Sequence, residues 1–237
     1  MKDKKRILYW VASAGCFLLF LALTAAVLWI DKAPIGPLGS EIGLSSLNGW
    51  ARDAIGQNAF WYDLTEWLGY LALASAGGLA LLGLWQLIRR KGLLKIDWDL
   101  YCAAGAYALV AAFYVFFEIA IVNYRPILME GVLEASYPSS HTMLTVCLSG
   151  IAAHQLWKRL PSLTGKWISL ILWGGVGIGT VVGRLLSGVH WLTDILGGAL
   201  LGAAILLAYF GATVVTSFLK NHKVSENKGE NYDHAGI

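Results

Sequence analysis

Charged side chains are scarce in this sequence. Lysine, arginine, aspartate and glutamate make up 14% of the 237 residues, whereas hydrophobic residues make up 57% and the mean hydropathy is +0.60. A soluble globular domain carries about 25% charged residues, so the composition excludes an ordinary soluble protein. The few charges also gather in short clusters between long apolar stretches. The sequence therefore predicts an integral membrane protein, and its length favours a single domain.

Disulfide and metal-binding patterns are also lacking. The three cysteines, Cys16, Cys102 and Cys147, all lie inside apolar runs, where cysteine usually serves as a small packing residue. This placement argues against a disulfide framework. The sequence has no Cys-x-x-Cys pair and no cysteine–histidine cluster, so we expect no metal ion.

Long apolar runs are abundant instead. A helix that crosses a bilayer needs about 20 mostly apolar residues, and six runs qualify: 7–30, 66–88, 98–122, 142–157, 167–183 and 191–219. We therefore expect an all-α, polytopic membrane protein with six transmembrane helices in one domain over residues 1–220. Residues 221–237 are polar without apolar periodicity, which predicts a disordered cytoplasmic tail.

Glycine is concentrated in the last two of these runs. A nucleotide-binding glycine loop would need a preceding strand, and the sequence predicts none there. Close packing of helices through small residues fits the pattern better. We expect a glycine-lined seam between adjacent helices.

Basic residues alternate between the ends of the runs. They occur at 2–6, 89–95, 158–166 and 220–223, which all fall on one side of a six-span arrangement. Lysine and arginine are enriched on the cytoplasmic side of membranes. Both termini should therefore be cytoplasmic, in a multi-pass protein of the plasma membrane. The extracytoplasmic side receives the connections 31–65, 123–141 and 184–190.

The connection at 31–65 is long and carries Trp50, Trp61 and Tyr62 among polar residues. Aromatic rings favour the headgroup region of a membrane. The sequence is compatible with interfacial helices against the outer leaflet and with an ordinary ordered loop.

Two segments with a histidine lie at the extracytoplasmic boundary. In one, His190 and Asp194 are four residues apart on one helix face, so the carboxylate can accept a hydrogen bond from one ring nitrogen. The other nitrogen is then free to act as a nucleophile. Arg184 lies six residues earlier, and the turn between them can bring its guanidinium back toward the imidazole. The plain alternatives are a helix-start histidine with a capping aspartate and an arginine anchored in headgroups.

The other segment is Pro138-Ser139-Ser140-His141. Serine is a favoured N-cap residue, and the free N–H groups of a helix start can bind an anion. His141 in that first turn could donate a proton to a leaving oxygen, and a plain helix cap is the alternative. The remaining histidines, His154, His222 and His234, fall near the inner surface or in the tail and are not expected to be catalytic.

Taken in order, these residues resemble the type-2 phosphatidic acid phosphatase (PAP2) superfamily, which is related to vanadium haloperoxidases and bacterial acid phosphatases. The family pattern is Lys-x6-Arg-Pro, then Pro-Ser-Gly-His, then Ser-Arg-x5-His-x3-Asp. Here it reads Arg125-Pro126, then Pro138-Ser139-Ser140-His141, then Arg184-x5-His190-x3-Asp194. The resemblance covers about residues 98–219 and implies a helical core like that of the haloperoxidases.

The resemblance also implies roles for these residues. His190 resembles the nucleophile that forms a phosphohistidine, Asp194 its orienting partner, and His141 the acid that protonates the leaving group. The implied phosphate clamp consists of Arg125, Arg184, Ser139 and Ser140. The family mechanism uses no metal ion and no other cofactor.

Three positions depart from the family pattern. Ser140 replaces glycine and Gly183 replaces serine, which are small exchanges, whereas the lysine position seven residues before Arg125 is Glu118. An ionisable residue inside a span is usually functional. Glu118 would lie about two helical turns from Arg125 on the same face. We therefore expect Glu118 to fix the orientation of the Arg125 or Arg184 guanidinium and not to contact the substrate.

The resemblance implies a membrane phosphatase that hydrolyses a lipid phosphate or diphosphate at the outer leaflet. Candidate substrates are prenyl diphosphates, phosphatidylglycerol phosphate and phosphatidic acid. Two alternatives stay open: a transphosphorylase that moves the phosphoryl group to another lipid or sugar, and a catalytically silent relative that binds or moves lipids. The expected partners are the lipid substrate and the bilayer. We expect no nucleic-acid partner, and the sequence leaves the oligomeric state open.

Overall fold

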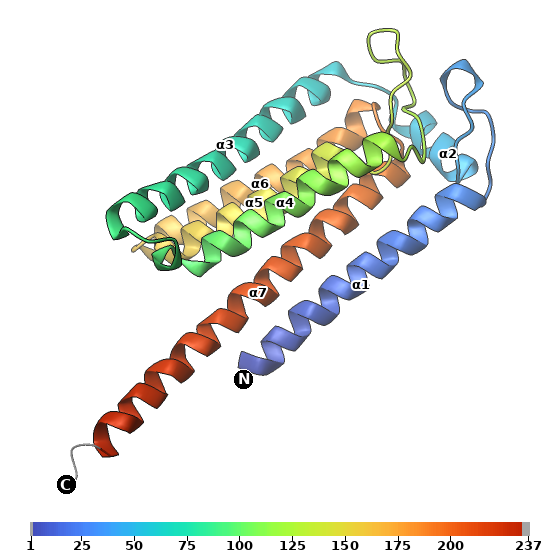
Figure 1. Cartoon of the computed structure of the whole chain (residues 1–237). Coiled ribbons are helices and arrows are strands. Elements are labelled where there is room, and N and C mark those ends of the chain that lie inside the picture. Colours follow the sequence, from blue (N-terminus) through green and yellow to red (C-terminus); the bar gives the residue numbers. More distant parts are fainter. Residues whose placement is uncertain (1, 234–237) are drawn as a thin grey trace.

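The computed structural model describes the backbone of residues 2–233 and the side chains of residues 4–214. Residues 2–233 form seven α-helices: α1 (Lys2–Trp29), α2 (Ser45–Ile55), α3 (Ala59–Arg90), α4 (Trp98–Ile119), α5 (Ser140–Arg159), α6 (Leu163–Ser187) and α7 (Leu192–Asp233). Two short 3-10 helices lie at Pro37–Gly39 (η1) and Leu93–Lys95 (η2). Residues 2–233 contain no strand, and the predicted all-α class is confirmed (Figure 1).

Six of these helices are long, and they fall where the six spans are predicted. Five of them, α1, α3, α4, α6 and α7, are long and apolar enough to cross a membrane. Helix α5 differs because it buries polar side chains along its length, among them Thr142, Thr145, Ser149 and Gln155. The six-span prediction therefore matches the number of long helices, whereas hydropathy identifies five of them as spans.

Helix α5 is polar because it packs against four other helices, α3, α4, α6 and α7. A helix surrounded by protein does not need an apolar surface toward lipid, and its polar groups can be satisfied by its neighbours. Gln155 Nε2 of α5 donates to the Tyr209 hydroxyl of α7 over 2.7 Å. Thr145 Oγ1 donates back to the His141 carbonyl over 2.8 Å. Hydropathy alone therefore does not identify this helix as a membrane span.

Glycines allow the neighbours of α5 to approach closely. A Cβ on Gly198 of α7 would lie 2.5 Å from the carbonyl oxygen of Ser139, just before α5. A Cβ on Gly183 of α6 would lie 2.5 Å from Cγ2 of Thr65 in α3. The close glycine packing that we expected is present. Helices α6 and α7 contact each other little, because α6 packs mainly against α5, and α7 packs mainly against α1 and α5.

The bundle has two distinct ends. The start of α1 and the end of α7 lie at one end, whereas α2 and the 120–139 connection lie at the other (Figure 1). Helix α1 runs along α7, and Ser13 Oγ donates a hydrogen bond of 2.8 Å to the Ala204 carbonyl between them. The sequence predicts this arrangement, because its basic clusters alternate between the ends of the expected spans.

Ion pairs join α4 and α5 at the end that carries the start of α1. Lys158 Nζ lies 2.7 Å from Asp99 Oδ2, and Arg159 Nη1 lies 3.2 Å from the same oxygen. Arg90 Nη1, at the end of α3, lies 2.8 Å from Asp97 Oδ1. The basic segments that follow α3 and α5 therefore meet at one end of the bundle, as the alternating clusters predict.

The connection between α1 and α3 is ordered and contains η1 and α2. A helix therefore forms within the 31–65 segment, although Trp61 and Tyr62 belong to α3. Asn48 of α2 is fully buried, and its Nδ2 donates to Thr193 Oγ1 over 3.0 Å. Helix α2 is thus fixed to the start of α7 and does not depend on a membrane surface alone.

Helix α7 continues to Asp233, and its apolar part includes Leu192–Val214. The segment 221–237, predicted to be a disordered tail, overlaps the end of this helix up to residue 233, and residues 234–237 lie outside the described residues. The disordered tail stays a prediction. The segment 221–233 contains no proline that would break the helix.

The two ends can be distinguished by cysteine labelling. Val132, in the 120–139 connection, is 60% exposed, and Leu94, between α3 and α4, is 100% exposed. If the basic end is cytoplasmic, Val132→Cys should react with a membrane-impermeant maleimide on intact cells. Leu94→Cys should react only after the cells are opened. The unsubstituted protein is the control for its three native cysteines, and labelling of Leu94→Cys on intact cells would reverse the orientation.

Candidate active site

Four predicted site residues converge at the end of the bundle that carries α2. Arg125 comes from the 120–139 connection, His141 from the first turn of α5, Arg184 from the last turn of α6, and His190 from the connection between α6 and α7. Arg125 Nη1 lies 3.3 Å from His190 Nε2. His141 and Arg184 both contact Glu66 of α3. The structure thus brings together residues that the sequence only assigned to the same side.

A serine orients His190. Nδ1 of His190 lies 3.0 Å from Ser136 Oγ, and Ser136 Oγ donates to Asp194 Oδ2 over 2.5 Å. The direct distance from Nδ1 to Asp194 Oδ2 is 3.7 Å, which is too long for the hydrogen bond that we predicted. Because Ser136 uses its hydrogen toward Asp194, its oxygen accepts from Nδ1–H of His190. The lone pair of His190 then lies on Nε2, beside Arg125.

Burial and nearby positive charges keep His190 neutral. Burial, together with the guanidinium groups of Arg125 and Arg184, holds the pKa of His190 well below the ordinary value for histidine. A neutral imidazole retains the lone pair that a nucleophile needs. Nε2 of His190 is therefore available for attack at neutral pH.

The loop between α6 and α7 is fixed on both sides. Gly188 ends α6 in the left-handed conformation with φ of 69°, and a Cβ there would lie 2.6 Å from the Gly56 carbonyl oxygen. Asp194 Oδ2 accepts from the Trp191 N–H over 2.9 Å. The Asp194 carbonyl accepts from the Ser139 N–H, also over 2.9 Å. This last bond joins the two histidine segments directly.

Arg184 is a buried guanidinium with spare donors, and only 1% of the residue is exposed. Nη2 donates to Glu66 Oε1 over 2.5 Å, and the guanidinium carbon lies 5.2 Å from the centre of the Tyr62 ring. Nε and Nη1 have no hydrogen-bond partner among the described residues. Buried donors without a partner are costly, and a guanidinium matches the oxygens of a phosphate. These two nitrogens therefore mark an anion site.

Arg125 pairs with a different carboxylate from the one we expected. Its Nε lies 3.1 Å from Glu134 Oε2. Glu118 is exposed at the end of α4, and within residues 4–214 no ion pair joins it to either arginine. Helix α4 ends just after Glu118, so the helix face that it was expected to share with Arg125 does not form. The supporting carboxylates are Glu134 for Arg125 and Glu66 for Arg184.

His141 faces both the arginines and an apolar cavity. Its Nε2 lies 3.2 Å from Glu66 Oε2. Gly69 of α3 makes room for the ring, because a Cβ there would lie 3.2 Å from Cδ2 of His141. The ring also lines a cavity of about 450 Å³ between α3, α4 and α5. His141 thus lies where the polar site meets space for an apolar group.

Ser139 is the N-cap of α5, and its Oγ accepts from the Thr142 N–H over 3.4 Å. The capping alternative is therefore correct for this side chain. The N–H groups of Ser140 and His141, in the first turn, have no acceptor within the helix. Such groups can bind an anion, so a cap and a phosphate contact are compatible in the same turn.

Sequence reasoning missed two members of this cluster, Glu66 and Ser136. Glu66 lies at the start of an apolar run, and a charged residue in such a run is itself a signal of function. Ser136 lies two residues before Pro138, but no spacing rule identifies it as a partner of His190.

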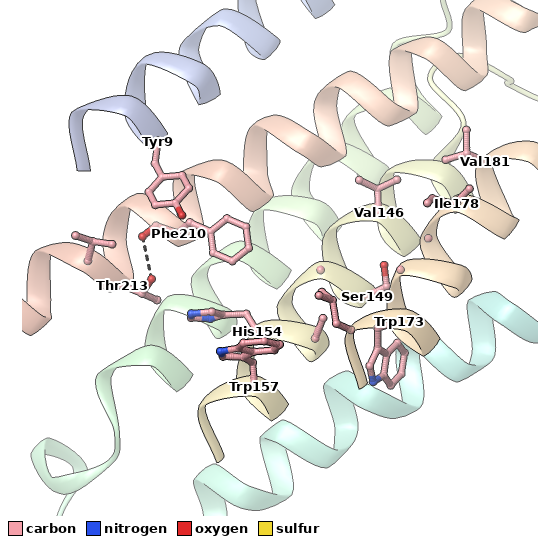
Figure 2. A pocket seen from close by; sticks show the side chains of 16 residues that line it. Tyr9, Val146, Ser149, His154, Trp157, Trp173, Ile178, Val181, Phe210 and Thr213 are labelled. Carbon is pink, nitrogen blue, oxygen red and sulfur yellow. Dashed lines mark hydrogen bonds between the residues drawn. The ribbon is translucent and has the colours of Figure 1, made fainter. Parts of the chain in front are cut away.

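A separate cavity of about 610 Å³ lies between α1, α5, α6 and α7 (Figure 2). Tyr9, His154, Trp157 and Phe210 line it. His154 Nδ1 is 2.8 Å from the Tyr209 hydroxyl, so this histidine has a partner in α7. Over the described part of the chain, no group of three or more His, Cys, Asp or Glu side chains could hold a metal ion.

Comparisons with known proteins identify the family. The model of the PAP2 superfamily matches residues 101–217. Phosphatidylglycerophosphatase B of Bacillus subtilis (strain 168) is 35% identical over 89 residues, which are 37% of this chain and 41% of that protein. Lipid phosphate phosphatase delta of Arabidopsis thaliana is 35% identical over 82 residues, which are 32% of this chain and 19% of that protein. The chain therefore spans less than half of the length of these curated relatives.

A solved structure shares the fold. The crystal structure of a transmembrane PAP2 type phosphatidylglycerolphosphate phosphatase from Bacillus subtilis aligns with a TM-score of 0.61 and 22% identity, over 84% of this chain and 94% of that one. Together with the five apolar helices, this likeness identifies a multi-pass helical membrane protein. Through the domain at residues 101–217, which carries both arginines and both histidines of the site, the chain belongs to the PAP2 superfamily.

Proposed function

We propose that this chain is a membrane phosphatase that hydrolyses a lipid phosphate or diphosphate through a phosphohistidine. The observation that carries the proposal is the buried Arg184, whose Nε and Nη1 have no partner in the described structure. His190 belongs to the same cluster and presents Nε2 beside Arg125. A phosphoryl group held by two guanidinium groups would therefore meet a nucleophile. The PAP2 domain and the names of the matched relatives support the same reaction.

In the first step, Nε2 of His190 attacks phosphorus and forms a P–N bond. The P–O bond to the leaving group breaks, and the leaving oxygen takes a proton from His141. Arg125 and Arg184 balance the charge on the remaining phosphate oxygens. The imidazole gains positive charge as the P–N bond forms, and Asp194 stabilises that charge through the intervening serine.

In the second step, water attacks the phosphorus of the phosphohistidine. His141, now without its proton, accepts a proton from that water. The P–N bond breaks, inorganic phosphate leaves, and His190 returns to its neutral form. His141 is again protonated, so the site is ready for another turnover.

The cavity beside His141 supports a lipid substrate. Its walls are mostly apolar or aromatic and include Tyr70, Leu73, Tyr107, Val110, Leu144 and Leu148. Each CH₂ group buried there would contribute about 0.8 kcal/mol to binding. The phosphate would then lie at the polar end of the cavity. The candidate substrates are phosphatidylglycerol phosphate, in view of the name of one relative, phosphatidic acid and prenyl diphosphates.

The basic clusters support an active site outside the cytoplasm. The ion pairs of Arg90, Lys158 and Arg159 join the ends of α3 and α5 to the start of α4. These helix ends lie opposite to the connection between α6 and α7, which carries His190 (Figure 1). Basic residues favour the cytoplasmic side. The site would then face the outer leaflet of the plasma membrane, with both termini in the cytoplasm.

Phosphate release tests the proposal. Detergent-purified protein should release inorganic phosphate from at least one of phosphatidylglycerol phosphate, phosphatidic acid and a prenyl diphosphate. His190→Ala should lower kcat by at least about 1,000-fold, because no phosphoenzyme forms. His154→Gln, at a histidine outside the site, is the matched control. Orthovanadate should inhibit as a mimic of the transition state.

Two results would contradict the proposal. Inactivation by EDTA with recovery on adding one divalent ion would replace the phosphohistidine mechanism with a metal-dependent one. A new lipid or sugar phosphoester formed in place of free phosphate would identify a transphosphorylase.

The leaving group tests the role of His141. His141→Ala should retain more activity on para-nitrophenyl phosphate than on an alkyl phosphate, because a good leaving group needs little protonation. The loss in kcat/KM should be about 100-fold larger for the alkyl substrate. Equal losses on both substrates would show that His141 is not the acid.

Replacing Ser136 tests the link between His190 and Asp194. Hydrogen bonds to charged groups contribute about 1.5–3 kcal/mol, so Ser136→Ala should lower kcat by roughly 10- to 100-fold with little change in KM. Ser149→Ala, at a buried serine far along α5, is the control. An unchanged kcat would mean that Asp194 orients His190 without the serine.

A further inference from the structure

Glu66 contacts both the proposed acid and the arginine clamp. Its Oε1 accepts from Arg184 Nη2 over 2.5 Å, and its Oε2 lies 3.2 Å from His141 Nε2. The residue is partly buried near the start of α3. In the described structure, it is the one carboxylate that pairs with either of these two residues.

A carboxylate at this place is unfavourable for phosphate binding. Negative charges a few ångströms apart repel each other, and Glu66 lies against the guanidinium that would hold the phosphate. It also occupies one donor of Arg184 that a phosphate oxygen could otherwise use. The contact with Arg184 offsets part of its buried charge. The contact with His141 gives the carboxylate a second role.

The other charges around His141 are positive. Arg184 of α6 and Arg125 of the 120–139 connection both act on its ring, and His190 lies in the same cluster. Positive neighbours and burial both disfavour a charged imidazole. A general acid must carry its proton before the P–O bond breaks. Glu66, from α3, supplies the negative charge that favours the protonated ring.

We propose that Glu66 is a positioning residue that favours the protonated form of His141 through its contact with Nε2 and holds the Arg184 guanidinium in place. The inference rests on the proposed function and identifies the group that prepares its acid. Glu66 acts through these two side chains and does not touch phosphorus. When the leaving oxygen takes the proton of His141, Glu66 remains paired with Arg184.

Glu66→Gln tests the inference because it removes the charge and keeps the size. The pH profile of kcat falls on the alkaline side when His141 loses its proton. Without the carboxylate the ring loses its proton more readily, so the alkaline side of the profile should move to lower pH by about one unit. At mildly alkaline pH, turnover of an alkyl phosphate should fall about tenfold, and that of para-nitrophenyl phosphate much less. Glu66→Asp keeps the negative charge and should therefore show a pH profile of kcat close to that of the wild type.

The controls separate this role from a purely structural one. Glu130→Gln, at an exposed acid in the 120–139 connection, should change neither the profile nor the ratio between the two substrates. Gel filtration in detergent reports folding. If Glu66→Gln does not fold, Glu66→Ala takes its place, with the same expected shift of the profile and the same contradicting results.

Two outcomes for Glu66→Gln overturn the inference. Equal losses on both substrates with an unchanged pH profile would assign Glu66 to packing alone. Faster turnover would show that the carboxylate only repels phosphate. Failure of the proposed function gives a different result, since the wild-type protein would then release no phosphate from any substrate.

Discussion

The site depends on the burial of one guanidinium inside a helical membrane protein. An unpaired charge there is strongly unfavourable. Glu66 offsets part of the charge of Arg184, and the Tyr62 ring covers one face of it. Both partners come from α3, which must therefore approach α6 closely. Gly183 permits the approach, because a Cβ there would lie 2.5 Å from Thr65. The glycine that replaces the family's serine thus has a packing role beside the arginine.

Helix α5 shows how the fold accommodates polar chemistry in a bilayer. It is surrounded by α3, α4, α6 and α7, so Thr145 and Gln155 find their hydrogen-bond partners within the protein. Its first turn presents the N–H groups of Ser140 and His141 toward the proposed phosphate position. The same central position leaves space between α3 and α4 for an apolar chain. One helix therefore connects the polar and apolar parts of the site.

The two histidine segments depend on each other. The Ser139 N–H donates to the Asp194 carbonyl, and the hydroxyl of Ser136 bridges Asp194 and His190. The proposed nucleophile is therefore oriented by the segment that carries the proposed acid. Substitutions in these two segments should not have additive effects, because their hydrogen bonds form one network.

The sequence by itself determined the helical class, the alternation of the helices and the choice of His190, His141, Arg125 and Arg184. These features depend on the length of the apolar runs, the positions of the basic clusters and the spacing of the motif residues. All three are local patterns in the sequence. Only the tertiary structure decided the partners of these residues. Glu66 lies 118 positions from Arg184 and 75 from His141, and Ser136 lies 54 positions from His190. Glu118 lines the same cavity as Arg125 and His190, although α4 ends just after it, and its supporting role stays a prediction. Hydrogen-bond partners depend on which helix faces and loops are neighbours in space. The periodicity of the sequence does not predict these neighbours.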